Sequence, residues 1–205
     1  CAGQDDGGDG GGDTTTTTDS SNGDTQNELV SLFGKKIGTI NPHRALDDVE
    51  LLSSINFYDP FVYFTPDNQV VSHVAQEWNV EDEGQTWVFT IRDDIQTHAG
   101  NDLTAEDVVY SADRFVSMDQ GFSSLWEGFY EEGNIEARDE TTVEISLEKP
   151  YGPFLGTLVL FFMVDSTVVQ ENASGEDMGR EYLSSNVAGS GPYTMRSWNA
   201  GSEIM

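Results

Sequence analysis

Three histidines, His43, His73 and His98, have the widest chemical repertoire in this chain, because imidazole can ligate a metal or transfer a proton. They lie in three separate segments, without the i, i+4 pairing of a helical metal motif, and the single cysteine is residue 1. The spacing therefore predicts no protein-ligated metal and no cofactor.

Neighbouring carboxylates could act as acid–base pairs in hydrolysis. Four such groups occur: Asp47-Asp48, Glu81-Asp82-Glu83, Asp93-Asp94 and Glu131-Glu132. Each lies at a predicted turn or helix end beside further acids, a pattern typical of solvated surface. The chain also has no nucleophile elbow, phosphate-binding loop, dinucleotide fingerprint or zinc-protease motif. We therefore predict that the protein is not an enzyme.

Acidic residues dominate the charge: 37 Asp and Glu stand against 9 Lys and Arg in 205 residues, a net charge of −28. Such a surface repels nucleic acid and anionic membrane faces, so it excludes both as charge-driven partners. The acids are spread along the whole chain and lysine is scarce, which favours a halophilic protein whose charges are screened by concentrated salt. The alternative is an ordinary soluble acidic protein.

The single cysteine is followed by Ala2-Gly3 and a long polar run, and no disulfide can form within the chain. A cysteine in this position resembles the lipidated residue that remains after a lipoprotein signal peptide is cleaved; the alternative is a chain trimmed at this point. We expect residues 1–27 to form a disordered tether rich in Gly, Asp and Thr. A lipid on Cys1 would anchor it to the membrane, at the extracellular face of the cell.

Two segments predict structure most clearly. In residues 86–92, Trp87, Phe89 and Ile91 alternate with polar residues, which indicates a half-buried strand. The turn signal at residues 81–84 joins it to a preceding strand in a hairpin. A helix then begins after Thr104, an N-cap residue.

The apolar residues of this helix recur at helical spacing as far as Met118. Asp107, three residues after the N-cap, completes an acidic variant of the capping box. We expect Asp107 and Arg114 to face water.

Further elements are predicted along the chain from periodicity and turn signals. They are strands at 28–34 and 61–64, helices at 46–57 and 121–132, a hairpin at 134–148, a buried strand or helix end at 158–164, partly helical residues at 165–185, and a loop at 189–198 that leads into a last strand. The predicted fold is mixed α/β (α+β), with a mixed sheet, flanking helices and β-hairpins in a domain of residues 28–205.

Five segments, taken in order, resemble one family: the extracytoplasmic solute-binding proteins of peptide/nickel-type ABC importers, family 5. They are Gly38-Thr-Ile-Asn-Pro-His43, Tyr58-Asp-Pro-Phe61, residues 74–93, Leu103-Thr-Ala-Glu-Asp-Val-Val-Tyr-Ser111 and Gly189-Ser-Gly-Pro-Tyr193. Together they extend over nearly all of the predicted domain. One departure is Thr97-His-Ala-Gly100, where the family often has phe-his-asp-gly.

The resemblance implies a two-lobed clamp that closes over a peptide-like solute and delivers it to a membrane permease. Because family members are usually much longer, we expect this chain to correspond to the N-terminal lobe, truncated before the second lobe. The implied partners are a small solute, with an oligopeptide as the expected class, and the permease subunits of an ABC transporter.

The candidate solute contacts lie outside the hairpin and its helix. The loop of residues 38–45 offers free backbone groups that can bind a peptide main chain, unless it is an ordinary connection. In the resembling family an aromatic residue at the position near Trp126 can line the cleft; the alternative is that Trp126 packs in the core. Phe161 has the same two alternatives. Tyr58 could point either toward the cleft or toward the core. The predicted ligand-binding residues are Asn41, His43, Arg44, Ala45, Tyr58, Trp126 and Phe161.

A second hypothesis assigns the chain a structural role. A lobe without its partner could serve as a surface or filament subunit and use its exposed half-cleft as a protein contact. Separately, Asn172-Ala-Ser174 is the only N-glycosylation sequon, which makes Asn172 a candidate modification site.

Overall fold

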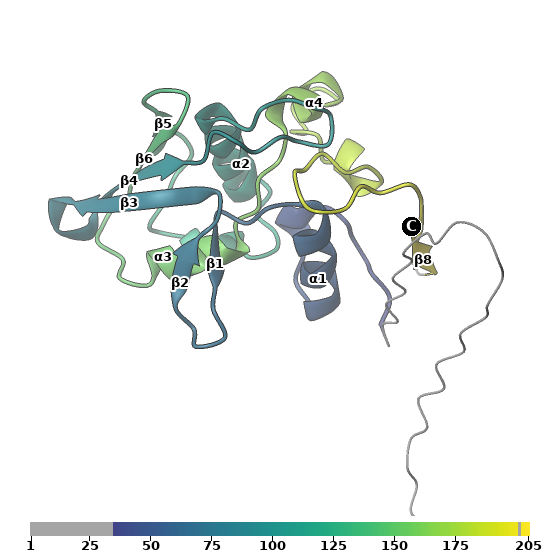
Figure 1. Ribbon diagram of the computed structural model, residues 1–205, viewed down its shortest axis with the longest axis horizontal. Helices are drawn as coiled ribbons and strands as arrows, with labels where there is room; N and C mark the ends of the chain where they lie inside the picture. Colours follow the sequence, from purple (N-terminus) through teal and green to yellow (C-terminus); the bar gives the residue numbers. More distant parts are fainter. Residues whose placement is uncertain (1–34, 201) are drawn as a thin grey trace, which may run out of the picture. The chain divides into compact units, whose positions relative to one another are not determined.

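The largest sheet of the protein has four antiparallel strands (Figure 1). The structure, a computed structural model, describes residues 35–200 and 202–205. The sheet runs in the order β3 (Ala75–Glu81), β4 (Thr86–Ile91), β6 (Thr142–Ser146) and β5 (Ile135–Ala137). The lipidation candidate Cys1, the predicted tether of residues 1–27 and the predicted strand at 28–34 lie outside the described residues.

The inner strand β4 has the alternation expected from its sequence. Trp87, Phe89 and Ile91 are buried, and Phe89 lies opposite Trp78 on β3 and Val143 on β6. The turn between β3 and β4 is the short 3-10 segment η2 (Asp82–Gly84), whose three residues all have positive φ. The hairpin predicted from the turn signal is confirmed, as is the hairpin of β5 and β6.

Helix α2 (Ala105–Ser117) begins at the predicted capping box, in which the Thr104 N–H donates to Asp107 Oδ2 over 2.8 Å. Its apolar face packs against β5 and β6. Three buried residues on this face, Val108, Ala112 and Phe115, join the same hydrophobic cluster as the sheet. The amphipathic pattern therefore placed the helix correctly.

The prediction that Asp107 and Arg114 face water is wrong, since they are 6% and 0% exposed. With Ser111 they form a second stripe at i, i+4 and i+7, away from the apolar face. This stripe contacts α4 (Ser166–Glu171) and the chain around it: Ser111 Oγ accepts from the Val164 N–H, and Asp107 Oδ1 accepts from the Ser166 N–H. Figure 1 shows α2 between the sheet and α4. Because this helix is covered on both sides, its single apolar stripe does not predict all of its buried residues.

The remaining elements are short. In chain order they are η1 (Pro42–Arg44), α1 (Asp48–Phe57), β1 (Val62–Phe64), β2 (Val70–Ser72), η3 (Ser123–Trp126), α3 (Phe154–Thr157), η4 (Leu158–Leu160), η5 (Tyr182–Ser184), β7 (Trp198–Asn199) and β8 (Glu203–Ile204). The first and last pairs of strands form small antiparallel ladders of their own, β1 with β2 and β7 with β8. The mixed α/β fold class is confirmed. The apolar residues 158–164 are a helix end rather than a strand.

The predicted aromatic-rich helix at residues 121–132 is wrong. Only η3 is helical there, and turns follow it. Gly121 and Gly128 have φ of +65° and +71°, and Gly133 just beyond has +89°. These left-handed positions break the right-handed helix that the aromatic spacing indicates.

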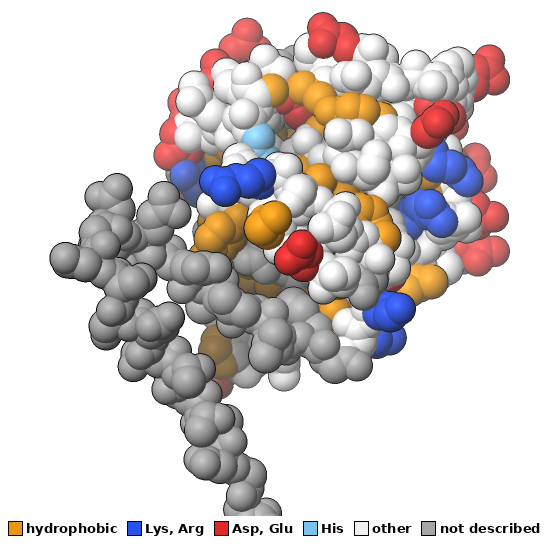
Figure 2. Space-filling view, turned by 90° about the vertical axis from the view of Figure 1, so that its right-hand side faces the viewer, with side chains coloured by type: hydrophobic (Ala, Val, Ile, Leu, Met, Phe, Trp, Pro, Cys, Tyr) orange, Lys and Arg blue, Asp and Glu red, His pale blue; other side chains and the backbone are white. Residues whose placement is uncertain are grey.

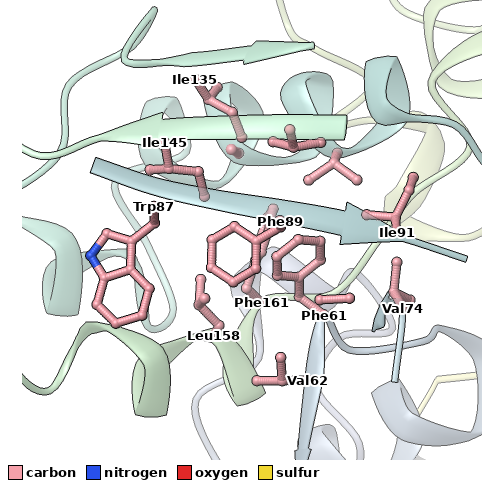
Figure 3. Close-up of a cluster of buried hydrophobic side chains, with 14 of the residues drawn as sticks. Phe61, Val62, Val74, Trp87, Phe89, Ile91, Ile135, Ile145, Leu158 and Phe161 are labelled. Atoms are coloured by element: carbon pink, nitrogen blue, oxygen red, sulfur yellow. The ribbon is translucent and has the colours of Figure 1, made fainter. Parts of the chain in front are cut away.

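Two hydrophobic clusters form the core of the described part of the chain. The larger lies between β4 and the helical segments after Phe154, and Figure 3 shows Trp87 and Phe89 of β4 directed toward Leu158 and Phe161. The smaller joins the end of α1 to α4 and includes Tyr58 and Phe162. The segment of residues 161–164 contributes to both clusters and so connects them.

Large apolar side chains are also exposed on the surface, among them Leu46, Leu52 and Tyr193. Figure 2 shows one face, the right-hand side of Figure 1, where exposed apolar side chains lie between acidic ones near the edge. In the part of the chain that the structure describes, we find no helix with the length and apolar content needed to span a bilayer.

Candidate functional site

The loop before α1 leads into a buried turn. Residues 36–40 belong to no helix or strand: Lys36 and Gly38 are exposed, Ile37 and Thr39 are half-buried, and Ile40 is buried. Their backbone makes no main-chain hydrogen bond to another described residue. The chain then enters η1, where Asn41 is the cap: its Oδ1 accepts from the His43 N–H over 3.2 Å, and its carbonyl accepts from the Arg44 N–H over 3.1 Å. Pro42 at the first position is preset for such a turn.

Beneath this turn lies a fully buried polar cluster of Asn41, His43 and Arg114. Arg114 Nη1 donates to Asn41 Oδ1 over 3.2 Å and to His43 Nδ1 over 2.7 Å. Because a guanidinium can only donate, His43 Nδ1 must be the acceptor and the ring proton must sit on Nε2. That Nε2–H donates to the Phe162 carbonyl over 2.8 Å. The geometry thus assigns one neutral tautomer.

Burial controls the protonation of this cluster. It lowers the pKa of His43 well below 6.5, and the positive charge of Arg114 adds to that effect. Burial also lowers the pKa of Arg114 to about 10, so the guanidinium stays charged at neutral pH. No carboxylate among the described residues forms an ion pair with Arg114. Two buried donors, Arg114 Nη2 and Asn41 Nδ2, have no hydrogen-bond partner among the residues that the structure describes.

The structure brings some of the predicted ligand-binding residues together and separates others. Residues 41–45 form one loop, and Phe161 stacks near His43 with ring centroids 6.4 Å apart. All of the predicted residues except Arg44 are buried, at 1% exposure or less: Asn41, His43, Ala45, Tyr58, Trp126 and Phe161. Arg44 is half-exposed. Their contact with a solute stays a prediction.

Trp126 lies in the core, the alternative left open by its sequence. Its ring contacts Phe115, Phe154 and Phe161 at centroid distances of 5.0 to 5.6 Å. Its indole N–H donates to Thr157 Oγ1 over 2.9 Å, which satisfies the polar end of the ring. In this arrangement Trp126 supports Phe161, and through it the turn containing His43.

Tyr58 forms the end of α1 and is buried against residues 189–193, and this burial raises its pKa. A Cβ on Gly189 would lie 2.2 Å from the Phe57 carbonyl oxygen, and one on Gly191 would lie 2.5 Å from the Phe57 carbonyl carbon. Only glycine permits this approach. The Gly191 N–H donates to that carbonyl oxygen over 3.1 Å.

A histidine, an aspartate and a serine also meet beside this segment. Asp59 Oδ1 accepts from His73 Nε2 and Asp59 Oδ2 accepts from Ser190 Oγ, both over 2.7 Å. The carboxylate stands between the other two residues, whereas a nucleophilic triad needs the histidine there. This arrangement therefore holds segments together and does not activate Ser190.

The sequence reasoning did not select Arg114, Asp59 or Ser190. Arg114 could have been noticed as part of the i, i+4, i+7 stripe on α2. Asp59 and Ser190 lie within two of the segments that resemble the family, but nothing in the sequence shows that they meet. Among the described residues, no group of three or more His, Cys, Asp or Glu side chains is placed to hold a metal ion.

Residues 69–205 match the family described as "Bacterial extracellular solute-binding proteins, family 5 Middle". The chain is also 30% identical over 174 residues to the probable D,D-dipeptide-binding periplasmic protein DdpA of Escherichia coli (strain K12), covering 82% of this chain and 33% of that protein. The chain belongs to the family 5 solute-binding proteins. The resemblance expected from the five segments is thereby confirmed.

A second relative is similar in sequence, and a solved structure shares the fold. The nickel-binding periplasmic protein of Escherichia coli (strain K12) is 28% identical over 136 residues, covering 65% of this chain and 25% of that protein. The Helicobacter pylori periplasmic binding protein DppA in complex with peptide STSA has the same fold, with a TM-score of 0.71 at 21% identity, over 83% of this chain and 37% of that one. The chain spans about a third of the length of the curated relatives it matches.

Proposed function

We propose that this chain forms the first lobe of an extracytoplasmic receptor that binds a peptide-like solute and delivers it to an ABC permease. The observation that carries the proposal is the irregular backbone of residues 36–40, whose N–H and C=O groups have no main-chain partner among the described residues. A peptide main chain can pair with such groups whatever its side chains are. Relatives named for dipeptide and glutathione binding support this choice of solute.

The seven predicted ligand-binding residues remain the proposed neighbourhood of the solute. Arg44 has the exposed side chain among them and is the proposed direct side-chain contact. Asn41 and His43 shape the loop from below, and Trp126 and Phe161 support it. The other wall of the cleft belongs, in this proposal, to a second lobe.

Thr39 offers a direct test of the backbone of residues 36–40. Its N–H makes no bond within the described chain, while its Oγ1 accepts from the Asn41 N–H over 3.1 Å. Thr39→Ala and Thr39→Pro both remove the Oγ1 bond, but only proline also removes the main-chain donor. In the complete encoded protein, titrated with short peptides in molar salt, we expect Thr39→Pro to bind about tenfold more weakly than Thr39→Ala.

The readouts are tryptophan fluorescence and the thermal shift on peptide addition. Equal affinities for the two Thr39 variants would show that the residue 39 amide does not bind the solute. If the wild-type protein shows no response to any peptide in a broad library, the peptide-receptor proposal is wrong.

The proposal includes an anchor on the extracellular face of the cell membrane through a lipid on Cys1. It also keeps Asn172 as a glycosylation site, because this residue is exposed at the end of α4. Mass spectrometry of the protein from its native cells tests both. Unmodified peptides containing Cys1 and Asn172 would contradict these assignments without affecting the proposed solute.

A further inference from the structure

Arg114 donates hydrogen bonds to the loop before α1 and to one other backbone carbonyl. Nη1 reaches Asn41 Oδ1 and His43 Nδ1, and Nε donates to the Met178 carbonyl over 2.8 Å. All three acceptors are neutral. Arg114 is fully buried and has no carboxylate partner within residues 35–200 and 202–205. Such burial is costly, so it needs a reason other than charge pairing.

The acceptors show what this guanidinium does. Asn41 Oδ1 also accepts from the His43 N–H, so the same oxygen caps η1 and bonds to Arg114. The imidazole of His43 is bonded at both nitrogens, to Arg114 and to the Phe162 carbonyl. The two side chains that define the turn after residue 40 are therefore fixed from α2.

Close packing restricts the turn from a second direction. A Cβ on Gly121 would lie 2.6 Å from the His43 carbonyl oxygen and 3.2 Å from that of Ala45. The chain at Gly121 thus lies directly against residues 43–45. With Arg114 on one side and Gly121 on another, the loop has little freedom to change its path.

We propose that Arg114 is a positioning residue for solute binding: through Asn41 and His43 it holds the loop so that the backbone of residues 36–40 is presented in one conformation. This rests on the proposed function, because it assumes that this backbone meets the solute. A preorganised loop binds more tightly since less ordering remains to be done on binding. Arginine suits the task because one planar group reaches separate acceptors, whereas lysine has a single nitrogen.

The test compares Arg114→Lys with Arg138→Gln in the complete protein. Arg138 is half-exposed and forms an ion pair with Glu144, so its loss removes a positive charge without touching the loop. Hydrogen exchange is measured at the His43 and Arg44 amides, both of which bond to Asn41, and at the amides of β4 as an internal reference. We expect exchange at the two loop amides to rise about tenfold over that in β4 for Arg114→Lys alone.

Asn41→Asp provides a second variant that does not weaken the cluster. It keeps the Oδ1 acceptor and offers a carboxylate to the guanidinium, and it removes the Nδ2 donor, which has no partner within the described part of the chain. We expect slower exchange at the loop amides in this variant. Unchanged loop exchange in both variants, or a rise in Arg114→Lys that is equal in β4 and the loop, would overturn the positioning role.

Peptide affinity separates this inference from the proposed function. We expect Arg114→Lys to weaken peptide binding about tenfold and Arg138→Gln to leave it unchanged. Normal peptide affinity in Arg114→Lys despite faster loop exchange would also refute the positioning role, while the receptor itself would stand. A wild-type protein that binds no peptide would instead refute the proposed function, and the exchange result would be unaffected.

Discussion

Gly121 and Gly133 form a matched pair for measuring how tightly the loop before α1 is packed. Both have left-handed backbone, with φ of +65° and +89°. A Cβ at Gly133 would meet nothing within 4 Å, whereas one at Gly121 would lie 2.6 Å from the His43 carbonyl oxygen. Alanine at either position introduces backbone strain, but only Gly121→Ala adds a collision with main-chain atoms that cannot rotate away.

The two contributions can be given separate magnitudes. Left-handed strain costs an alanine about 1–2 kcal/mol, so Gly133→Ala should lose about that much stability. Overpacking typically costs a further 1–3 kcal/mol or so, and this applies to Gly121→Ala. For a domain of this size 1 kcal/mol changes Tm by about 2–4 °C. A collision of about 2 kcal/mol should thus separate the two midpoints by roughly 4–8 °C.

Scanning calorimetry in molar salt measures both variants beside the wild type, and urea unfolding gives the free energies directly. We expect Gly121→Ala to melt well below Gly133→Ala. Equal Tm values for the two variants would refute the reasoning, because the loop would then be moving aside at no cost. That result would contradict the inference that the turn next to residues 36–40 is held rigidly.

Two further predictions concern polar groups that are buried or partly buried. His43 stays neutral in the native state because burial lowers its pKa. As the pH falls through about 6.5, only the unfolded chain takes up a proton at this residue. The free energy of unfolding should then decrease by up to about 1.4 kcal/mol per pH unit. His43→Gln should remove that slope in urea unfolding at pH 7.5 to 5.5, and an identical slope in the variant would contradict the assignment. Ser190→Ala removes a hydrogen bond to the Asp59 carboxylate and should lower the free energy of unfolding by about 1.5–3 kcal/mol. The control Ser184→Ala removes an exposed hydrogen bond to the Glu181 carbonyl and should lower it much less. Equal decreases in the two variants would show that Asp59 does not hold Ser190.

The hairpin of β3 and β4 and helix α2 could be predicted because their signals are local. Alternating Trp87, Phe89 and Ile91 specify a strand, and Thr104 with Asp107 specifies a helix start. Both signals act within a few residues, so no knowledge of the remaining chain is needed.

The rest depended on contacts between distant segments. The polar stripe of α2 looks solvent-exposed until α4 and the loop before α1 cover it, so the burial of Arg114 could not be foreseen from the helix alone. The aromatic spacing of residues 121–132 indicated a helix because the left-handed backbone of Gly121 and Gly128 is not visible in a pattern of side chains. The same limit applies to Trp126, whose direction depends on those turns.

The end of α1 has a consequence for how the protein is made. Its last carbonyls, at Asn56 and Phe57, accept hydrogen bonds from the amides of Tyr193 and Gly191. At a synthesis rate of roughly 5–20 residues per second, the ribosome needs on the order of 7–30 s to deliver these partners after α1 has emerged. During that interval the two carbonyls lack these hydrogen-bond partners, although the apolar partners of Tyr58 around α4 have already been synthesised. A pause in translation just before Gly189 would therefore prolong the time for which the end of α1 lacks its last hydrogen bonds.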